Sequence, residues 1–245
     1  MEKFDDILMS NSYFQFKQFR IQQDQCAMKV CTDACILGAW FAEKIPSLSS
    51  VLDIGSGTGL LMLMLAQKNK SEIDGIEVDL NAYKQQKENI EQSPWKNQLH
   101  AFPGDIRSFS FSGKYDFIIS NPPFYENDLQ SVSSSRNLAM HSKELRLQEL
   151  LLAIDANLDP GGSFGILIPY HRLNEFEGLA YELKFYPNEK LFIQQTPNHE
   201  YFRVVLHLSR NQEDFIDEST LTIQQEDGGY TNEFVELMKD YYLRL

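Results

Sequence analysis

The sequence has 245 residues, of which 42% are hydrophobic, and its formal net charge is −13 at neutral pH. This length and hydrophobic content predict one large α/β domain with a substantial core. The excess of acidic residues argues against a general nucleic-acid-binding protein, because phosphates are recognised mainly by Lys and Arg. No apolar run approaches the length of a membrane span, and residues 1–6 do not have the pattern of a signal peptide.

Three cysteines, Cys26, Cys31 and Cys35, lie close together in the sequence, and it contains no others. An odd number of thiols argues against a disulfide scaffold and fits a reducing compartment, so we expect a cytoplasmic protein. A structural metal site would need a fourth ligand, which this spacing does not supply. We therefore predict no metal and interpret the cysteines as small buried side chains on a helix.

The first predicted elements are a short hairpin and a helix. Residues 12–22 alternate apolar and polar side chains, and the alternation changes phase at Gln18, which indicates a tight turn or a bulge. Farther along, Thr32 or Asp33 is suited to cap a helix that continues to Phe41.

A linker is predicted to begin at Pro46, which several serines follow. We therefore divide the chain into residues 1–46, a hairpin and helix extension, and residues 47–245, the main domain. The hairpin region carries more basic than acidic side chains. We accordingly assign Lys17 and Arg20 to a local basic surface for substrate binding.

A glycine-rich turn follows the first strand of the main domain. Residues 51–54 are apolar apart from Asp53, residues 55–59 read GSGTG, and a leucine- and methionine-rich helix follows over residues 60–67. Glycines at such a turn let the backbone approach a ligand at a helix N-terminus. The third glycine comes one residue too early for the dinucleotide-binding pattern GxGxxG. The pattern instead resembles motif I of class I methyltransferases.

Two more acidic residues follow at the ends of the next two predicted strands. Glu77 ends a strand over residues 72–78, at the distance from Asp53 where an acid binds ribose hydroxyls in doubly wound folds. After a polar helix, a third strand near residues 99–102 leads to Asp105. Both acids are predicted to lie at the carboxyl edge of the sheet, where such folds bind ligands.

The fourth strand ends in the tetrapeptide NPPF. The apolar run over residues 117–119 is followed by Asn121, Pro122, Pro123 and Phe124. Prolines cannot donate to a sheet ladder, so they end the strand in a stiff turn. This tetrapeptide resembles the (N/D)PP(F/Y/W) motif of S-adenosylmethionine-dependent methyltransferases that modify amino or amide nitrogens.

The rest of the chain completes an alternating pattern. Residues 125–141 are polar and predict a long loop or lid, in which Arg136 and His141 stand out. Further helices are predicted at 145–157, 173–183 and near the C-terminus, and further strands at 164–168, 190–194 and 202–208. We predict a doubly wound, Rossmann-like sheet of seven strands, the last one antiparallel, with the small N-terminal hairpin and helix extension.

Flanking segments make the resemblance more specific. The segments CAMKVCTDACILGAW, SNPPFYEN and RNLAMH, together with the aromatic C-terminal helix, are similar to the bacterial tRNA1(Val) adenine-37 N6-methyltransferases. This resemblance covers nearly the whole chain. It implies an enzyme that uses S-adenosylmethionine to methylate the exocyclic N6 amine of an adenine in tRNA.

The resemblance also implies roles for individual residues. It places the extension over the cofactor, with Thr32 and Asp33 in the covering segment. The remaining implied roles are methionine-portion contacts for Asp53, Gly55 and Gly57, ribose binding for Glu77, adenine binding for Asp105, target-amine binding for Asn121 and Pro122, base stacking for Phe124, and further substrate contacts for Tyr125 and Arg136.

Other substrates and roles stay open at this point. The same motif serves methylation of guanine N2 in rRNA and of glutamine amides in proteins, and the acidic composition mildly favours a protein substrate. A catalytically silent cofactor-binding subunit is a third hypothesis, against which the intact Asn121 and Phe124 argue. A loop histidine such as His141 is expected to contact phosphate or backbone rather than act as a base. We expect a monomer.

Overall fold

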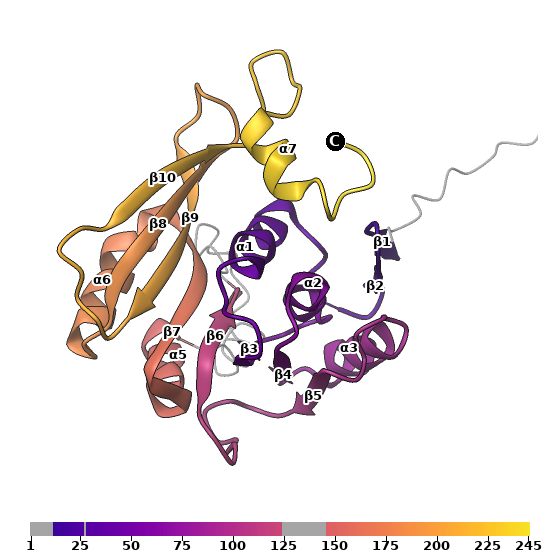
Figure 1. Cartoon of the computed structure of the whole chain (residues 1–245), viewed down its shortest axis with the longest axis vertical. Coiled ribbons are helices and arrows are strands. Elements are labelled where there is room, and N and C mark those ends of the chain that lie inside the picture. The colour runs from indigo at the N-terminus through magenta and orange to yellow at the C-terminus, as the bar shows by residue number, and fades with distance from the viewer. Residues whose placement is uncertain (1–11, 27, 124–145) are drawn as a thin grey trace, which may run out of the picture.

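The computed structural model describes residues 12–26, 28–123 and 146–245, and the statements below concern these ranges. At its centre is an eight-stranded sheet flanked by helices (Figure 1). In spatial order its strands are β10 (Asp217–Thr222), β8 (Tyr186–Gln194), β9 (Tyr201–Ser209), β7 (Leu158–Pro169), β6 (Tyr115–Ser120), β3 (Ser50–Ile54), β4 (Glu72–Glu77) and β5 (Leu99–Pro103).

Every strand of this sheet except β9 runs in one direction. β9 is antiparallel to both of its neighbours, β7 and β8, whereas the remaining pairs are parallel. The carboxyl ends of β3, β4, β5, β6 and β7 therefore meet at one edge, called here the carboxyl edge. The chain adds β4 and β5 on one side of β3 and then β6 and β7 on the other, so the strand order reverses between β3 and β6. Doubly wound sheets bind ligands at this point.

Helices cover both faces of the sheet (Figure 1). Apolar residues of the central strands point alternately to each face, and they form two separate hydrophobic clusters with the helices. One face is covered by α1 (Thr32–Ala42), α2 (Leu60–Lys68), α3 (Leu80–Glu91) and α7 (Asn232–Met238), and the other by α5 (Leu147–Asn157) and α6 (Leu173–Glu182).

The predicted fold class is confirmed, and the strand count differs by one. The seven predicted strands correspond to β3–β9, with the last one, β9, antiparallel as expected. The eighth, β10, adds to the edge of the sheet parallel to β8. Its sequence DESTLT has no apolar alternation, and its first four residues are exposed, so no hydrophobic pattern indicated a strand there.

The N-terminal hairpin is confirmed. β1 (Tyr13–Gln15) and β2 (Arg20–Gln22) pair antiparallel, and the Phe16 amide donates to the Phe19 carbonyl oxygen across the turn. The hairpin packs against the C-terminal tail, where Phe16 forms a backbone bridge with Tyr242 and the Lys17 amide donates to the Tyr241 carbonyl oxygen. The first and last described segments of the chain are therefore neighbours.

Two details of the N-terminal region were predicted wrongly. The N-cap of α1 is Cys31, with no side-chain capping bond, rather than Thr32 or Asp33. The Asp33 carboxylate instead forms an ion pair with Arg203, 3.0 Å away. Of the cysteines, Cys35 is buried on α1 as expected, whereas Cys26 is half-buried and Cys31 exposed. At the other end, Thr231 caps α7 by accepting a hydrogen bond from the Phe234 amide.

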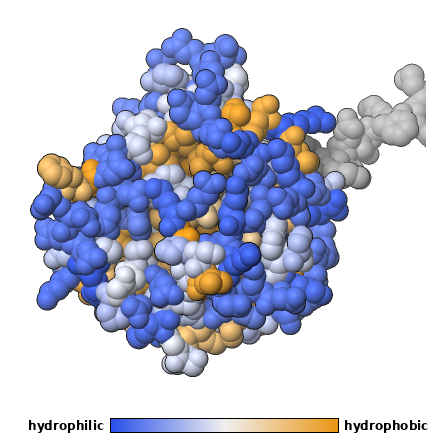
Figure 2. Space-filling view, in the orientation of Figure 1, coloured by the Kyte–Doolittle hydropathy of each residue, from blue (hydrophilic) through white to orange (hydrophobic). Residues whose placement is uncertain are grey.

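The surface reflects the composition. Figure 2 shows one face as largely hydrophilic, with hydrophobic residues visible beside α7. No helix in the described ranges combines the length and apolarity needed to cross a bilayer. Within the same ranges, no three His, Cys, Asp or Glu side chains are grouped as metal ligands.

Candidate cofactor and target-amine site

The glycine-rich turn forms a shallow backbone cradle between β3 and α2. Gly55 and Gly57 have φ values of +72° and +56°, and a Cβ at either position would meet no atom within 4 Å. Open space rather than crowding surrounds these positions, so the left-handed backbone is what favours glycine there. The turn leads through Gly59 into the N-terminus of α2. Such an exposed backbone can approach a ligand closely.

Glu77 supports this cradle from the end of β4. Its carboxylate accepts hydrogen bonds from the Gly57 amide at 2.8 Å and from the Asp79 amide at 2.7 Å. Only 8% of the residue is exposed, and burial raises the pKa of its carboxyl group above the ordinary value. Glu77 thus fixes the shape of the turn, and each of its oxygens still has a lone pair for a ligand hydroxyl.

Asp53 lies on β3 directly before the cradle and is completely buried. Neither of its carboxylate oxygens has a hydrogen-bond partner among the described residues. Burial, and then the nearby negative charge of Glu77, raise the pKa of Asp53 well above its ordinary value. A buried carboxylate without a partner is costly, so its presence indicates that a donor or cation is supplied from outside the described chain.

Asp105 follows β5 and is held by Arg107. The guanidinium Nη2 lies 2.6 Å from one carboxylate oxygen, and Nε lies 2.9 Å and 3.0 Å from the two oxygens. These contacts lower the pKa of Asp105, so the group stays ionised. Arg107 also reaches Glu149 on α5 at 3.5 Å. Arg107 was not predicted from the sequence, although its position two residues after an acid was a visible signal.

Asn121 and Pro122 lie at the end of β6, next to the strand that carries the cradle. β6 pairs with β3 so that Ser120 is opposite Ile54, and the Ser120 hydroxyl donates to the Ile54 carbonyl oxygen at 2.8 Å. Asn121 is half-buried, and no described residue hydrogen-bonds its side chain; Pro122 is buried. The structure therefore brings the Asn-Pro turn and the glycine turn together. Four residues of the predicted site lie outside the described ranges: Phe124, Tyr125, Arg136 and His141.

The segment before α1 lies along the carboxyl edge. Near its start, the Gln25 amide donates to the Gln85 side-chain oxygen on α3 at 3.2 Å. At its end, Asp33 pairs with Arg203, which lies opposite Pro169 at the carboxyl end of β7. Thr32 stands beside Asp33 at the start of α1. The described residues on either side of residue 27 thus contact α3 and the strand next to β7.

Lys17 and Arg20 are not brought together with Asn121. The Lys17 ammonium donates to the Lys239 carbonyl oxygen, and Arg20 lies over the Tyr13 ring, 4.4 Å from its centre. The neighbouring Phe19 contacts Trp95, which follows the C-terminal end of α3, away from the glycine turn. A role for this hairpin in substrate binding stays a prediction.

An aromatic cluster at the carboxyl edge was also missed. The rings of Tyr170, Phe192 and Tyr201 meet with centroid distances of 5.1 to 5.9 Å. Tyr170 directly follows β7 and is 40% exposed, whereas Phe192 and Tyr201 are half-buried. Tyrosine immediately after a buried strand was the available signal. Because β7 is next to β6, this cluster extends the surface that Asn121 begins.

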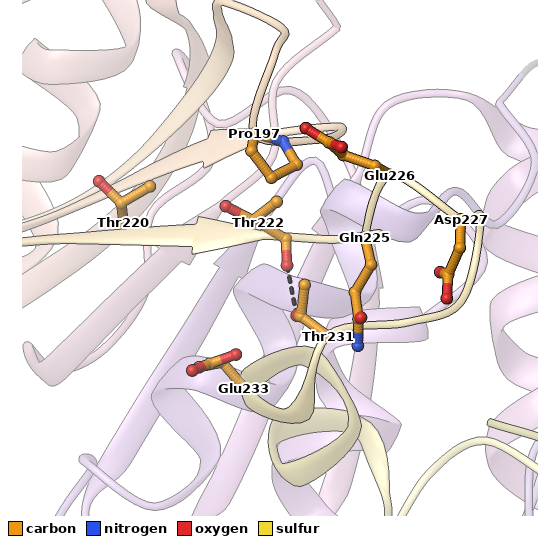
Figure 3. A pocket seen from close by; sticks show the side chains of 8 residues that line it. All are labelled: Pro197, Thr220, Thr222, Gln225, Glu226, Asp227, Thr231 and Glu233. Carbon is orange, nitrogen blue, oxygen red and sulfur yellow. Dashed lines mark hydrogen bonds between the residues drawn. The ribbon is translucent and has the colours of Figure 1, made fainter.

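A separate hollow lies at the far edge of the sheet (Figure 3). It lies beside β10, and β8, β9, β7 and β6 separate β10 from β3. Its side chains include three carboxylates, and Figure 3 shows the Thr231 hydroxyl bonded to the Thr222 backbone. The lining residues are Pro197, Thr220, Thr222, Gln225, Glu226, Asp227, Thr231 and Glu233. This hollow is not part of the glycine-turn site.

Comparisons with known proteins identify the family. Residues 36–168 match the model of the methyltransferase small domain. The chain is 41% identical to a tRNA1(Val) (adenine(37)-N6)-methyltransferase from Dyadobacter fermentans, covering 96% of this chain and 98% of the relative. It is 39% identical to a protein of the same name from Flavobacterium johnsoniae, covering 95% and 100%. The chain belongs to the tRNA1(Val) (adenine(37)-N6)-methyltransferase family.

Solved structures support the fold. The crystal structure of a predicted O-methyltransferase from Agrobacterium tumefaciens has a TM-score of 0.67 at 12% identity and covers 85% of this chain and 96% of that one. The sequence-based predictions of a class I methyltransferase fold, of this family and of an S-adenosylmethionine-dependent enzyme are confirmed. The roles of individual residues stay predictions.

The residues at the site fit S-adenosylmethionine. That cofactor carries positive charge on its sulfonium and amino groups, and Asp53 is a buried carboxylate that no residue in the described ranges hydrogen-bonds. Its ribose hydroxyls need acceptors, which Glu77 offers beside an open glycine backbone. Asp53 therefore offers the negative charge, and the glycine turn the space, that the cofactor requires.

Proposed function

We propose that this protein transfers a methyl group from S-adenosylmethionine to the exocyclic N6 amine of adenine 37 in tRNA1(Val). The relatives' shared name over nearly the full length supports this substrate. The observation that carries the chemistry is the position of Asn121 and Pro122, hydrogen-bonded through Ser120 to the strand that leads into the glycine turn.

The proposed role of Asn121 and Pro122 is to hold the amine. An adenine amino group is a poor nucleophile because its lone pair is delocalised into the ring. The Asn121 side-chain oxygen and the Pro122 carbonyl oxygen each accept one N–H, which draws the nitrogen towards a tetrahedral geometry. Bound S-adenosylmethionine supplies an electrophilic methyl group on sulfur. Fixed acceptors of this kind stabilise developing charge without reorganisation.

The geometry of the site supports the cofactor contacts that we propose. Asp53, Gly55 and Gly57 line the methionine portion, Glu77 accepts from ribose, and Asp105, held ionised by Arg107, accepts from the adenine amine. Thr32 stands in the segment along the carboxyl edge, so we retain residues 1–46 as an extension covering the cofactor and residues 47–245 as the main domain.

The proposed tRNA contacts rely on stacking more than on charge. Phe124 stacks on the target base, and Tyr125 and Arg136 bind nearby. Neighbouring unpaired nucleotides stack on the exposed Tyr170 and the rings beside it. Recognition through aromatic faces suits a protein whose net charge is −13. Lys17 and Arg20 then serve, at most, a more distant part of the tRNA.

The proposal is tested with radiolabelled S-adenosylmethionine and total tRNA from a strain that lacks the gene. After incubation with pure protein, the RNA is digested and the labelled nucleoside identified. Label in N6-methyladenosine, confined to tRNA1(Val), is the expected result. Parallel reactions contain rRNA or a protein extract. Label in guanine N2 of rRNA or in a glutamine amide, with none in tRNA, would show that the proposed tRNA substrate is wrong.

Two further points belong to this proposal. We propose a cytoplasmic protein, in keeping with three free cysteines. We also propose a monomer, which sedimentation of the pure protein at several concentrations tests directly. A concentration-independent mass of about one chain, 28.4 kDa, is expected.

A further inference from the structure

Helix α3 carries three buried amide side chains where a packed helix usually carries apolar ones. Gln85, Gln86 and Asn89 are each no more than 1% exposed. We call them the amide row. Burying an amide costs free energy unless its donors and acceptors are paired. Their partners are therefore informative about why these residue types are present.

Asn89 has contacts on two sides. Its oxygen accepts from the Gln22 amide at 2.8 Å, and its nitrogen donates to the Gln22 carbonyl oxygen at 3.1 Å. The same nitrogen donates to the Thr58 carbonyl oxygen at 2.9 Å. Gln22 ends the N-terminal hairpin, and Thr58 belongs to the glycine turn. One side chain thus joins two segments that are 36 residues apart in sequence.

Each of the two glutamines hydrogen-bonds one of these two segments. Gln85 contacts only the N-terminal side, accepting from the Gln25 amide at 3.2 Å and donating to the Asp24 carboxylate at 2.6 Å. Gln86 contacts the turn, donating to the Ser56 hydroxyl at 2.8 Å. Within the row, Gln85 therefore binds residues 24–25 and Gln86 binds the glycine turn. Asn89 binds both segments.

We propose that the amide row couples docking of residues 22–25 to the conformation of the glycine turn, with Asn89 as the positioning residue that carries the coupling. The inference rests on the proposed function in one respect, that the glycine turn binds the cofactor. Docked residues 22–25 fix Asn89, and Asn89 fixes the Thr58 carbonyl within the turn.

Such coupling is reciprocal. If the docked segment strengthens cofactor binding by some factor, a bound cofactor strengthens docking by the same factor. The N-terminal extension then senses whether the turn is occupied, without contacting the reacting atoms. A purely structural amide row would stabilise the fold but would not link the two events.

The most informative variant is Gln85→Leu, because the side-chain hydrogen bonds that Gln85 makes within the described residues go to Gln25 and Asp24 and not to the glycine turn. Asn89→Asp is the second variant, since it keeps the size of the side chain and replaces both donated bonds with a repelling oxygen. Asn157→Asp is the matched control, because Asn157 is a buried amide that bonds only the Ala153 carbonyl within α5. Affinity for S-adenosylhomocysteine is measured by calorimetry, and hydrogen exchange is measured with and without it.

We expect Gln85→Leu and Asn89→Asp to weaken S-adenosylhomocysteine binding by about five- to tenfold, within the usual range of coupling between sites. In the wild type and in Asn157→Asp, the ligand slows exchange both in residues 55–59 and in residues 22–25. In the two variants it slows exchange in residues 55–59 alone. Should Asn89→Asp fail to fold, Gln85→Leu decides the question.

Unchanged affinity in Gln85→Leu, with ligand protection retained in residues 22–25, would overturn the coupling. Failure of the wild type to bind S-adenosylhomocysteine would overturn both the coupling and the proposed function. Failure to methylate tRNA, with coupled binding intact, would overturn the proposed substrate and leave this inference standing.

Discussion

The Ser120 hydroxyl donates a hydrogen bond to the Ile54 carbonyl oxygen, 2.8 Å away. This bond joins the last residue of β6 to the last residue of β3, so the turns that follow the two strands keep a fixed separation. One turn carries Asn121 and the other carries Gly55. In-line methyl transfer depends on such alignment, because misplaced reactants lose much of the rate advantage of proximity.

Asn121→Ala is expected to lower kcat by about 10²- to 10³-fold, the usual effect of removing one fixed acceptor or donor from a reacting centre. Affinity for S-adenosylhomocysteine is expected to stay unchanged, because the proposed role of the side chain is to hold the target amine rather than the cofactor. Steady-state kinetics with tRNA and calorimetry measure the two quantities. Asn198→Ala, which changes an exposed amide far along the chain, is the control. Full activity in Asn121→Ala would contradict the mechanism.

Asp53→Asn is expected to stabilise the protein and to weaken cofactor binding. An amide costs less to bury than an unpaired carboxylate, so the free energy of unfolding at pH 7 should rise by about 1 kcal/mol or more. Because the folded-state pKa of Asp53 is raised, the wild type loses stability as pH rises through the window from about 3.8 to that pKa. The advantage of Asp53→Asn should therefore grow from pH 4 to pH 7.

Urea unfolding at several pH values measures this difference. Asp74→Asn is a matched control, since burial also raises the pKa of Asp74, but the Tyr115 hydroxyl donates to its carboxylate at 2.6 Å. Its replacement removes a satisfied acceptor and should stabilise less. A loss of stability in Asp53→Asn at pH 7 would show that the buried charge has a partner.

Tyr170→Ala is expected to raise the KM for tRNA roughly tenfold, because stacking of a base on an aromatic ring contributes about 1–3 kcal/mol. The affinity for S-adenosylhomocysteine should not change. Tyr181→Ala serves as control, since Tyr181 is similarly exposed on α6, where it contacts Tyr186. An equal KM for tRNA in the two variants would show that the aromatic cluster does not bind tRNA.

His207 is expected to make the fold sensitive to mild acid. The ring lies between Glu189 and Ser163, with nitrogen-to-oxygen distances of 2.9 Å to each. Burial lowers the pKa of His207 despite the Glu189 charge, while Lys44 acts in the same direction as burial. The unfolded chain therefore takes up a proton at a higher pH than the folded one, and stability falls as pH drops below about 6.5.

This dependence is measured by urea unfolding of the wild type and of His207→Gln between pH 5 and pH 7.5. The glutamine variant should lose less stability over that interval, because it removes the group that protonates on unfolding. If the free energy of unfolding changed equally with pH in the two proteins, the acid sensitivity would come from other residues.

Local sequence patterns were sufficient for much of the fold. Apolar runs separated by helical segments located β3–β9, and the glycine turn and the Asn-Pro turn follow the strands after which they were predicted, while the roles of their residues stay predictions. The edge strand β10 was missed because an exposed strand carries no apolar pattern. The cap of α1 was wrong because the helix begins at Thr32, so that Cys31, with its extended backbone, occupies the N-cap position and Asp33 lies in the first turn, where it also pairs with Arg203.

The supporting contacts of the site could not be predicted in the same way. Asn89 reaches Gln22 and Thr58, and Arg107 holds Asp105 within a half-buried environment, but neither residue type indicates such a role by itself. These contacts depend on how distant segments meet in three dimensions. A polar residue within a helical pattern is ordinarily expected on the solvated face.

The meeting of the hairpin with the C-terminal tail has a consequence for synthesis. Lys17 donates to the carbonyl oxygen of Lys239, a residue translated 222 positions later. Domains generally fold as units while the ribosome delivers the chain. Here the hairpin emerges early, yet it can contact Tyr241 and Tyr242 only after the whole sheet between them has been translated. A nascent chain halted before those tyrosines therefore lacks the backbone contacts that dock its hairpin.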